Sequence, residues 1–409
     1  MERVAVTGIG LATPLGDTPD QFFDALLRGD SGIALYTAST PDESVAVPAA
    51  SCPLRAEDHF TRAELSSLDR VSQLSVLAAR RAWETAAPAP DGAERDSAGV
   101  FWGTGMGGAQ TLENSYLDLL ARRRGRVHPL TVPNTMNNAA AAHIAMRHEL
   151  GGAALTYSVA CASSAVAIGE AWRRIRSGEC ALAVAGGGEA LLSFGVIRSW
   201  QALQVLARGD AETAHRACRP FASDRDGLVL GEGAGALVLE NWQRAQARGA
   251  RILGEIVGYG LSCDHLHLTR PDAQGQLRAM RQALAVAGIA AADLGYVNAH
   301  GTATGEGDRA ECEALQLLLG AAVDRVGVSS TKSAHGHLMG AAGAVEFIAT
   351  LMALARRTLP PTAFLEEVDP ACALAHVKGA PRRDDSLRYA MSNSFAFGGS
   401  NAVLIAAAA

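Results

Sequence analysis

Lysine is almost absent from this sequence: Lys332 and Lys378 are the only two lysines, and all other residues of the Lys+Arg count are arginines. The two side chains do different work, because the lysine ammonium is a compact point charge and the arginine guanidinium is a planar fork. A chain that uses arginine nearly everywhere indicates a need for the ammonium where it keeps one. Lys332 is the stronger candidate, since it begins the polar segment Lys-Ser-Ala-His-Gly-His that ends at His337.

Three further absences each argue against a class of protein. The seven cysteines form no CxxC pair, and an odd number in a long chain argues against a disulfide scaffold. The net charge is −6 and no basic block exceeds residues 122–126, so nucleic acid is not expected as the main partner. No apolar run reaches membrane-spanning length without a polar residue, and residues 1–10 resemble a strand and a turn rather than a signal peptide. We therefore expect a cytoplasmic protein that does not contact a membrane.

Glycine is plentiful: the chain has 43 glycines, and it is 48% apolar and 19% charged. This composition predicts a tightly packed α/β protein with many close approaches between helices and sheets. Strand-like runs alternate with helical runs, as in parallel sheets covered by helices. The predicted strands are 3–6, 99–102, 155–159, 181–185, 234–239, 296–298, 326–329, 389–393 and 402–407; the predicted helices are 19–27, 72–86, 138–149, 163–177, 277–287, 309–319 and 340–355; the predicted loops are 37–48, 87–95 and 206–217.

The two halves of the chain resemble each other, since each has a strand that ends in a glycine-rich turn and continues into a helix. We predict an N-terminal half of residues 1–248 and a C-terminal half of residues 249–409. In open α/β sheets, ligands bind beyond the carboxyl ends of the strands, where the topology reverses. A site shared between the halves would follow this rule.

Cys161 stands where an apolar run turns into a small-residue helix, in Ser-Val-Ala-Cys-Ala-Ser-Ser. Most free cysteines are buried small hydrophobes. A thiol at a helix N-terminus, however, meets free backbone N–H groups and the positive end of the helix dipole, and both favour the thiolate. The neighbouring alanines leave room for a substrate, so we predict that Cys161 is a nucleophile.

A polar cluster begins at His300, between a predicted strand and a predicted helix. Asp308 and Glu311 lie about one helical turn apart, so they can orient polar groups from behind. Thr302 and Thr304 alternate, so both hydroxyls can line one wall of a channel. A lone histidine is more often a satisfied core residue, and the polar surroundings argue against that interpretation here.

His337 lies beside His335 in a segment where only small residues otherwise fit. The pair has the residue type of a zinc ligand set, but two histidines two residues apart lack a third ligand in the sequence. Neutral imidazoles that donate hydrogen bonds to a developing enolate oxygen explain the pattern better. We therefore predict no metal in the catalytic cluster.

Residues 103–108 fit the pattern GxGxxG and follow a predicted strand. No acidic residue stands about 20 positions further on, and no GxxxxGK[ST] motif occurs, so a dinucleotide site is disfavoured. We interpret this stretch, and the glycines at 398 and 399, as turns that allow close approach.

With these residues in place, the chain resembles the elongating β-ketoacyl-acyl-carrier-protein synthases of the thiolase superfamily. The resemblance covers essentially the whole chain, and the joint occurrence of its motifs makes it specific. It implies the thiolase fold, an internal duplication in five layers, α/β/α/β/α. Beside the segments at Cys161, His300 and His337, the motifs are Val4-Ala-Val-Thr-Gly-Ile-Gly, Arg219-Pro-Phe, Asp226-Gly-Leu-Val-Leu-Gly-Glu232-Gly, Ser329-Ser-Thr-Lys332-Ser and Asn393-Ser-Phe-Ala-Phe397-Gly-Gly-Ser-Asn401-Ala.

The resemblance also implies a role for each site residue. Cys161 would accept the acyl chain as a thioester, with the N–H groups of Cys161 and Phe397 as its oxyanion hole. Two histidines would stabilise the enolate formed from a malonyl thioester, Lys332 would fix them with Glu311 behind it, Asp308 would support the loop, and Phe397 would gate the site. The implied catalytic residues are Cys161, His300, His337, Lys332, Phe397, Glu311 and Asp308.

Further residues are implied in substrate binding. Two threonines would bond the phosphopantetheine arm, two methionines match the closed end of the acyl pocket, and a phenylalanine lines the site: Thr302, Thr304, Met106, Met136 and Phe395. Four residues match positions where relatives hold a structural cation: Asn298, Glu346, Ser392 and Asn393. No cofactor is implied, since acyl carrier protein brings both substrates on its phosphopantetheine.

The leading hypothesis is therefore an enzyme, an acyltransferase that condenses a Cys-bound acyl chain with malonyl-acyl carrier protein. Departures from the family pattern, such as Ala396 between the two phenylalanines, favour a type II polyketide or polyene pathway over fatty acid synthesis. Two alternatives stay open: a ketosynthase subunit that works only with a chain-length-factor partner, and an acyltransferase without chain extension. The expected partners are acyl carrier protein and a second copy of the chain, with a chain length factor as the other possible subunit.

Overall fold

A computed structural model describes all 409 residues and contains two similar sets of five strands. The first set has the order β1-β8-β6-β4-β5. Strands β1, β8 and β6 pair antiparallel, whereas β6, β4 and β5 run parallel. The strands span Val4–Ala12 (β1), Gly233–Asn241 (β8), Leu182–Glu189 (β6), Gly99–Gly103 (β4) and Ala154–Tyr157 (β5).

The second set has the order β9-β15-β14-β10-β11 and repeats the direction of every pairing in the first. This agreement shows the internal duplication that the sequence predicts. The boundary at 248/249 stays a prediction; it falls just after helix α10 and before β9. The strands span Gly254–Cys263 (β9), Ser400–Ala407 (β15), Tyr389–Ala396 (β14), Leu294–Asn298 (β10) and Gly327–Ser329 (β11).

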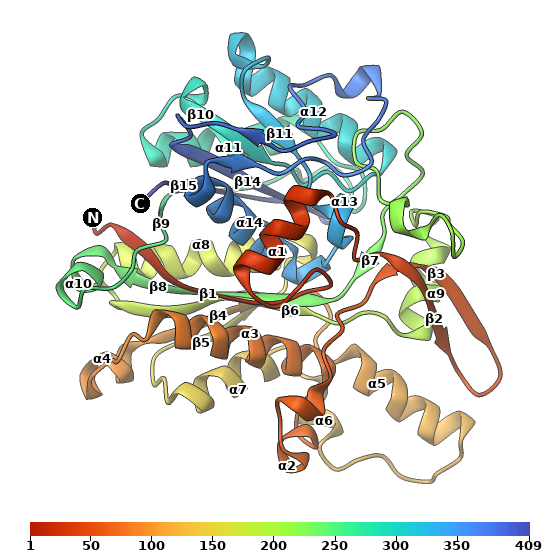
Figure 1. Cartoon of the computed structure of the whole chain (residues 1–409). Coiled ribbons are helices and arrows are strands. Elements are labelled where there is room, and N and C mark those ends of the chain that lie inside the picture. The colour runs from red at the N-terminus through yellow and green to blue at the C-terminus, as the bar shows by residue number, and fades with distance from the viewer.

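Helices cover both sheets and fill the space between them, so the expected five-layered α/β architecture is confirmed (Figure 1). Helices α3 and α7 cover the first sheet on its outside, and α11 and α12 cover the second. Helices α8 and α14 lie between the sheets, in the largest apolar core. The helices span Arg70–Ala86 (α3), Ala139–His148 (α7), Ala273–Ala287 (α11), Gly305–Leu319 (α12), Ser163–Arg176 (α8) and Ala342–Arg356 (α14).

The segment Met339–Arg356 is long and apolar enough to cross a membrane by length and composition alone. It includes α14, and 83% of it is buried inside the protein. Its apolar character is thus explained by its place between two sheets.

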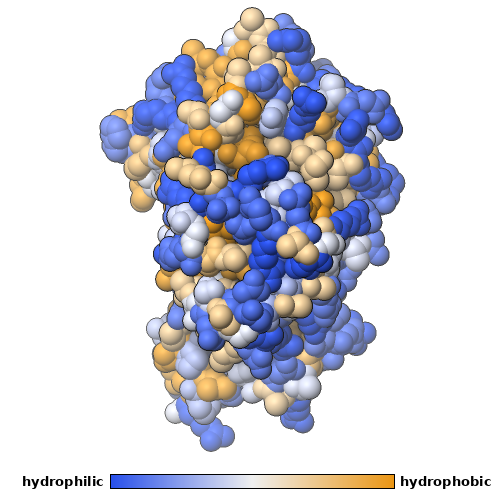
Figure 2. Space-filling view, turned by 90° about the vertical axis from the view of Figure 1, so that its left-hand side faces the viewer, coloured by the Kyte–Doolittle hydropathy of each residue, from blue (hydrophilic) through white to orange (hydrophobic).

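The two sheets join where β1 pairs with β9 over Val4–Val6 and Gly254–Ile256. On the outside of this seam, the Arg3 guanidinium forms an ion pair with Glu255 and lies 3.6 Å from the ring centroid of Trp242. Figure 2 shows the side of the molecule on which both termini lie, with hydrophilic side chains across its middle and apolar ones mainly in its upper part. An ion pair and a cation–π contact of Arg3 thus lie beside the seam.

Close packing of the outer helices on bare glycines repeats in both halves. A Cβ added to Gly10 of β1 would lie 2.0 Å from the carbonyl oxygen of Ala78 in α3. A Cβ added to Gly260 of β9 would lie 2.0 Å from the carbonyl oxygen of Ala279 in α11. The abundance of glycine is therefore explained, at these positions, by the close helix–sheet approach that the composition predicts.

Two of the predicted loops are wrong. Residues 37–48 form most of a hairpin whose strands β2 (Ala34–Ser39) and β3 (Ser44–Ala50) pair antiparallel, with Val45 and Val47 buried on one face. That alternation is the signal of a half-buried strand. Within 87–95, a short helix already begins at Gly92.

The remaining elements are α1 (Pro19–Arg28), α2 (Arg62–Leu65), α4 (Gly92–Ser97), α5 (Ala109–Tyr116), α6 (Thr131–Thr135), β7 (Leu230–Gly231), α9 (Phe194–Ala202), α10 (Trp242–Ala247), α13 (Lys332–His335), β12 (Thr358–Leu359) and β13 (Arg382–Arg383).

We expect Gly10→Ala and Gly260→Ala each to lower the thermal unfolding midpoint by several degrees. Each methyl group would press against a helix carbonyl, and overpacking of this kind costs about 1–3 kcal/mol. Thermal unfolding followed by circular dichroism measures the effect. Gly92→Ala is the matched control, since a Cβ there meets nothing within 4 Å; midpoints for Gly10→Ala or Gly260→Ala equal to that of the control would contradict the packing argument.

Candidate active site

Cys161 lies where β5 passes into the central helix α8. It occupies a single 3-10 turn, η3 (Ala160–Ala162), and Ala160 adopts a φ of +45°, which is strained for a residue with a Cβ. The strained turn places the thiol at the inner end of a cavity of about 490 Å³. Strain of this kind clusters at functional sites.

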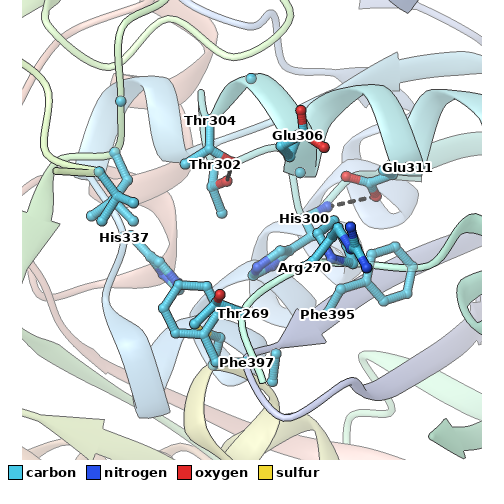
Figure 3. A pocket seen from close by; sticks show the side chains of 18 of the residues that line it. Thr269, Arg270, His300, Thr302, Thr304, Glu306, Glu311, His337, Phe395 and Phe397 are labelled. Atoms are coloured by element: carbon cyan, nitrogen blue, oxygen red, sulfur yellow. Dashed lines mark hydrogen bonds between the residues drawn. The ribbon is translucent and has the colours of Figure 1, made fainter. Parts of the chain in front are cut away.

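Three side chains converge at this end of the cavity. The sulfur of Cys161 and one ring nitrogen each of His300 and His337 all lie within 4.8 Å of one another, and all three residues are buried. Cys161 comes from the first half, and the histidines follow β10 and α13 in the second. Figure 3 shows His300 and His337 in the wall of the cavity. The structure thus brings together the nucleophile and the two histidines that the sequence predicts, in a site shared by the halves.

Both histidines present an Nε2–H to the cavity side of the cluster. The Lys332 ammonium lies 3.2 Å from Nδ1 of His300, and the N–H of Met339 donates to Nδ1 of His337 at 3.3 Å. Because each Nδ1 accepts a hydrogen bond, the proton of each neutral ring sits on Nε2. Nε2 of His337 is buried without a partner in the protein, so it is free to donate to a ligand.

Burial, the nearby Lys332 charge and the other histidine hold the pKa of His300 well below its ordinary value. Burial, Lys332 and His335 do the same for the pKa of His337. Both rings are therefore neutral hydrogen-bond donors at pH 7. The rings meet edge to face, with 5.3 Å between their centroids.

Lys332 pairs with Glu346, whose Oε1 lies 2.6 Å from the ammonium; both side chains are completely buried. The expectation that Glu311 stands directly behind Lys332 is corrected here, because Glu346 is the partner in contact. Glu346 comes from the middle of α14, where the sequence offers only a single glutamate in an apolar helix.

Glu311 acts on the backbone of the histidine loop instead. Its carboxylate accepts the N–H groups of His300 at 2.8 Å and Gly301 at 2.7 Å, and the amide of Asn393 at 3.0 Å. It therefore fixes the position of His300 without touching the imidazole ring.

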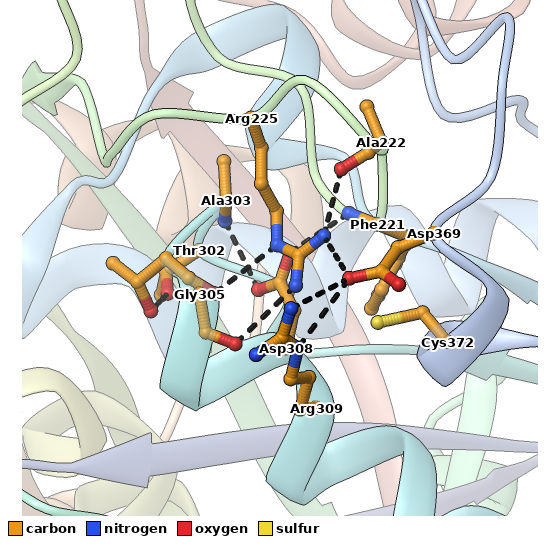
Figure 4. Close-up of polar contacts among 12 residues, drawn as sticks. Phe221, Ala222, Arg225, Thr302, Ala303, Gly305, Asp308, Arg309, Asp369 and Cys372 are labelled. Atoms are coloured by element: carbon orange, nitrogen blue, oxygen red, sulfur yellow. Dashed lines mark hydrogen bonds and ion pairs between the residues drawn. The ribbon is translucent and has the colours of Figure 1, made fainter.

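Asp308 lies behind the same loop and joins it to the first half of the chain (Figure 4). It accepts the N–H groups of Phe221 at 2.8 Å and Ala303 at 3.1 Å, and Arg225 lies 3.4 Å away. Arg225 pairs in turn with Asp369 at 2.8 Å. Asp308 supports the loop, as the resemblance implies, and it does not reach the cavity.

The electrostatics of Cys161 differ from the expectation. Burial raises the pKa of its thiol to about 11, although Lys332 and the N–H groups of Phe397 and Cys161 itself act the other way. Desolvation thus outweighs the Lys332 charge and the two N–H groups, so burial favours the neutral thiol over the thiolate. The N–H groups of Phe397 and Cys161 both act on the sulfur, and their role as an oxyanion hole stays a prediction.

The cavity wall carries the predicted polar and aromatic residues. The hydroxyls of Thr302 and Thr304 lie 2.9 Å apart and both line the cavity, as the alternation predicts (Figure 3). Phe395 and Phe397 line it from the opposite side. Phe397 stacks on Trp200 with 6.0 Å between the ring centroids, and no sequence motif pointed to this tryptophan.

Met106 and Met136 do not line this cavity. Both side chains are about half exposed on the surface of the single chain, at 49% and 46%. Their assignment to the closed end of an acyl pocket stays a prediction, and a second subunit would have to cover them for it to hold.

The residues of the implied cation site fit a cation in part. The side-chain oxygens of Asn298 and Asn393 are buried without a hydrogen-bond partner, and the Glu346 carboxylate is buried too. Asn298, Asn393, Glu346 and Ser392 would hold such an ion, which would add positive charge beside the Lys332 pair. Its presence stays a prediction.

A metal in the catalytic cluster fits less well. Three ligands and an open position are the pattern of catalytic zinc. Here the Lys332 ammonium already occupies Nδ1 of His300, and its charge would oppose a divalent cation. His335 is not part of the cluster, since its ring nitrogens contact the carbonyl of Gly336 and the hydroxyl of Thr331.

Sequence profiles identify the family. The profile of the β-ketoacyl synthase N-terminal domain matches residues 1–245, and that of the C-terminal domain matches residues 253–366. Nodulation protein E of Rhizobium sp. strain N33 is 40% identical over 402 residues, which cover 98% of each chain. The 3-oxoacyl-acyl-carrier-protein synthase 2 of Vibrio cholerae is 38% identical over 408 residues, again 98% of each chain.

Solved structures agree in fold along the whole chain. A β-ketoacyl synthase from Burkholderia phymatum STM815 has a TM-score of 0.89 at 37% identity, with 100% of each chain covered. The ishigamide ketosynthase/chain length factor has a TM-score of 0.91 at 31% identity, covering 100% of this chain and 99% of that one. A type II polyketide ketosynthase in complex with its acyl-carrier protein, AntDE:AntF, has a TM-score of 0.90 at 27% identity, with the same coverage.

We expect the rate of Cys161 alkylation by iodoacetamide to rise roughly tenfold per pH unit from pH 7 to 10, because only the thiolate reacts. A pKa of about 11 places the whole range below the plateau. Mass spectrometry of the peptide that contains Cys161 gives the rate. The unfolded chain is the control, where the same peptide should level off near the ordinary cysteine pKa; a plateau below pH 8 in the folded protein would show that its thiolate is stabilised.

Proposed function

The chain belongs to the β-ketoacyl synthase family and is an elongating condensing enzyme, and from this premise we propose the role of each side chain in its site. The observation that carries the assignment is the convergence of one thiol and two imidazoles within 4.8 Å. A thiol serves to hold the acyl chain, and two neutral Nε2–H donors serve to hold an enolate.

In the first half-reaction, the sulfur of Cys161 attacks the thioester carbonyl of an acyl-acyl carrier protein. The carbonyl oxygen takes the negative charge, and the N–H groups of Cys161 and Phe397 stabilise it. The carbon–sulfur bond to the carrier breaks, and the carrier thiol leaves with the proton that Cys161 gives up. Lys332 assists, since its charge favours the thiolate as the proton departs.

In the second half-reaction, His300 and His337 donate from Nε2 to the thioester carbonyl oxygen of malonyl-acyl carrier protein. The carboxylate leaves as CO2, and its bonding electrons form an enolate that the two donors stabilise. The enolate carbon attacks the acyl-Cys161 carbonyl, a carbon–carbon bond forms, and the Cys161 sulfur leaves as a thiolate that takes up one proton to restore the thiol. The product is a β-ketoacyl chain two carbons longer.

Phosphopantetheine of the carrier protein fits the wall made by Thr302 and Thr304, whose hydroxyls face the cavity. Acyl carrier protein is therefore the proposed partner; the solved AntDE:AntF complex holds a carrier protein on its ketosynthase. We propose no further cofactor, because every step above uses groups of the chain or of the carrier. Phe397, stacked on Trp200 and with its N–H at the sulfur, is the proposed gate.

A second subunit is proposed at the edge of the first sheet. Strand β5 is the last strand there, and Leu155 of β5, Met106 and Met136 are partly exposed apolar side chains. An open strand edge with apolar neighbours is a common pairing surface. We propose a homodimer, with a chain length factor as the other candidate, as in the ishigamide structure.

For the pathway, we propose a specialised type II polyketide or polyene route in the cytoplasm. Two of the solved structures reported above are ketosynthases of this kind or carry a chain length factor. Fatty acid elongation is the competing role, supported by the similarity to the Vibrio synthase. Transfer without extension is disfavoured, since simple transfer needs no pair of enolate donors.

The mass of the carrier-protein product tests the condensation. We expect the chain, mixed with acyl-acyl carrier protein and malonyl-acyl carrier protein, to yield a β-ketoacyl product two carbons longer. Cys161→Ala should abolish this product, because no acyl-enzyme can form, while malonyl decarboxylation continues on the intact histidines. Extended product from the Cys161→Ala variant would contradict the role of Cys161, and acylated wild-type enzyme without extension would indicate a missing partner.

Removal of one enolate donor tests the second half-reaction. We expect His337→Ala to lower CO2 release from malonyl-acyl carrier protein by about 10²–10³-fold, the usual effect of deleting one oxyanion donor. Acylation of Cys161 should fall far less. Released CO2 and the mass of the acyl-enzyme give the two rates. His335→Ala is the control, because that ring lies outside the cluster; unchanged CO2 release in His337→Ala would overturn the role of His337.

A further inference from the structure

Glu189 is a fully buried carboxylate at the end of β6 that none of the steps above uses. Its Oε2 accepts the N–H groups of Gly105 at 2.6 Å and Gly340 at 3.0 Å. Its Oε1 accepts the hydroxyl of Thr104 at 3.1 Å and, more weakly, the N–H of Met106 at 3.4 Å. Burial raises the pKa of Glu189 to about 7, and these four donors act against burial.

Thr104, Gly105 and Met106 belong to the loop after β4. This loop packs against the turn that carries the nucleophile, Cys161. The carbonyl oxygen of Gly105 accepts the hydroxyl of Ser158, three residues before Cys161. Just before the loop, Gly103 packs so closely on the start of α8 that a Cβ would lie 2.3 Å from the N atom of Ser164. A shift of this loop would therefore move the turn that carries Cys161.

The fourth donor, Gly340, belongs to the second half and lies next to the peptide that orients His337. Gly340 is part of the 3-10 turn η7 (Met339–Ala341), and the N–H of Met339 is the donor to Nδ1 of His337. The junction is tight, since a Cβ on Gly340 would lie 2.5 Å from the N atom of Gly105 and 2.7 Å from Oε2 of Glu189. Glu189 thus accepts hydrogen bonds from the backbone of both halves of the chain at one place.

The duplication supports this interpretation. In the second half, Glu311 accepts two successive N–H groups, those of His300 and Gly301, in the loop after β10. In the first half, Glu189 accepts two successive N–H groups, those of Gly105 and Met106, in the loop after β4. Since β4 and β10 hold the same place in their sheets, the loop after each of these two strands has its own buried carboxylate.

We propose that Glu189 is a positioning residue for condensation, which fixes the turn of Cys161 relative to the loop of His337 across the two halves. This inference rests on the proposed function. Acylation needs the Cys161 turn, and decarboxylation needs the histidines; only carbon–carbon bond formation needs the two held at one distance. Bond formation is sensitive to that distance, because a misplacement of about 1 Å can cost about 10²-fold in rate.

Glu189→Leu tests the proposal, because leucine has a similar size and removes both acceptor oxygens. Three rates are measured with hexanoyl- and malonyl-acyl carrier protein: acylation of Cys161, CO2 release without an acyl donor, and formation of the extended product. We expect product formation to fall at least about tenfold. Acylation and CO2 release should each fall less than about threefold, since neither depends on the distance between the halves.

Two control variants separate positioning from stability. Glu189→Gln should stay within about threefold of wild type in all three rates, because its amide oxygen can still accept from Gly105 and Gly340 while its NH2 donates to Thr104, so only the long contact from the N–H of Met106 is lost. Asp69→Leu removes another buried carboxylate, whose N–H donors, Val71 and Thr111, lie in the first half only. It should lower the thermal midpoint without the selective loss of product formation.

Gly340→Ala tests the same junction from the second half and remains informative if Glu189→Leu does not fold. Its methyl group would press Gly105 and Glu189 away, so we expect the same selective loss. The proposal is overturned if all three rates fall in parallel, or if Asp69→Leu shows the same selectivity. Wild-type product formation tests the proposed function, whereas the ratio of the three rates tests Glu189, so the two failures are distinguishable.

Discussion

One buried ammonium, held between a carboxylate and an imidazole, sets the chemistry of the site. Lys332 lies 2.6 Å from Glu346 and 3.2 Å from Nδ1 of His300. Burying two charges costs several kcal/mol per ion and is tolerated only when the geometry is good. Here the ammonium, which cannot accept a hydrogen bond, forces Nδ1 of His300 to accept and leaves the proton on Nε2. A planar guanidinium would not fill this point-like position, which explains a lysine here in a chain whose only other lysine is Lys378.

The duplication explains why the residues meet at all. Each half ends its parallel strands at the same edge, and the loops beyond those ends face each other across the two central helices. The first half supplies a turn with a thiol, and the second supplies two imidazoles with their supporting charges. Buried carboxylates such as Glu311 and Asp308 then fix these loops, because they accept backbone N–H groups of the loops. The loop backbone is therefore held in place together with the catalytic side chains.

The sequence predicted the parts of the structure that local patterns encode. The alternation of strand-like and helical runs, with glycine-rich turns between them, located nearly all central strands. Reactive or polar residues within segments of small residues pointed to Cys161, His300, Lys332 and His337. It could not reveal that Glu346 is the partner of Lys332, because that pairing depends on how α14 crosses α13. Nor could it give the thiol pKa, because burial and the helix N-terminus act in opposite directions and only the folded environment decides between them.

That burial has a single consequence for every titrating group at the reaction centre. It raises the pKa of the Cys161 thiol and lowers the pKa of both imidazoles, so burial favours the uncharged form of all three groups. In the proposed mechanism, negative charge appears only during the reaction, on the thioester oxygen or the enolate. Because neutral donors surround it and an ammonium lies behind them, the charge is stabilised when it forms, while the resting thiol and imidazoles carry none.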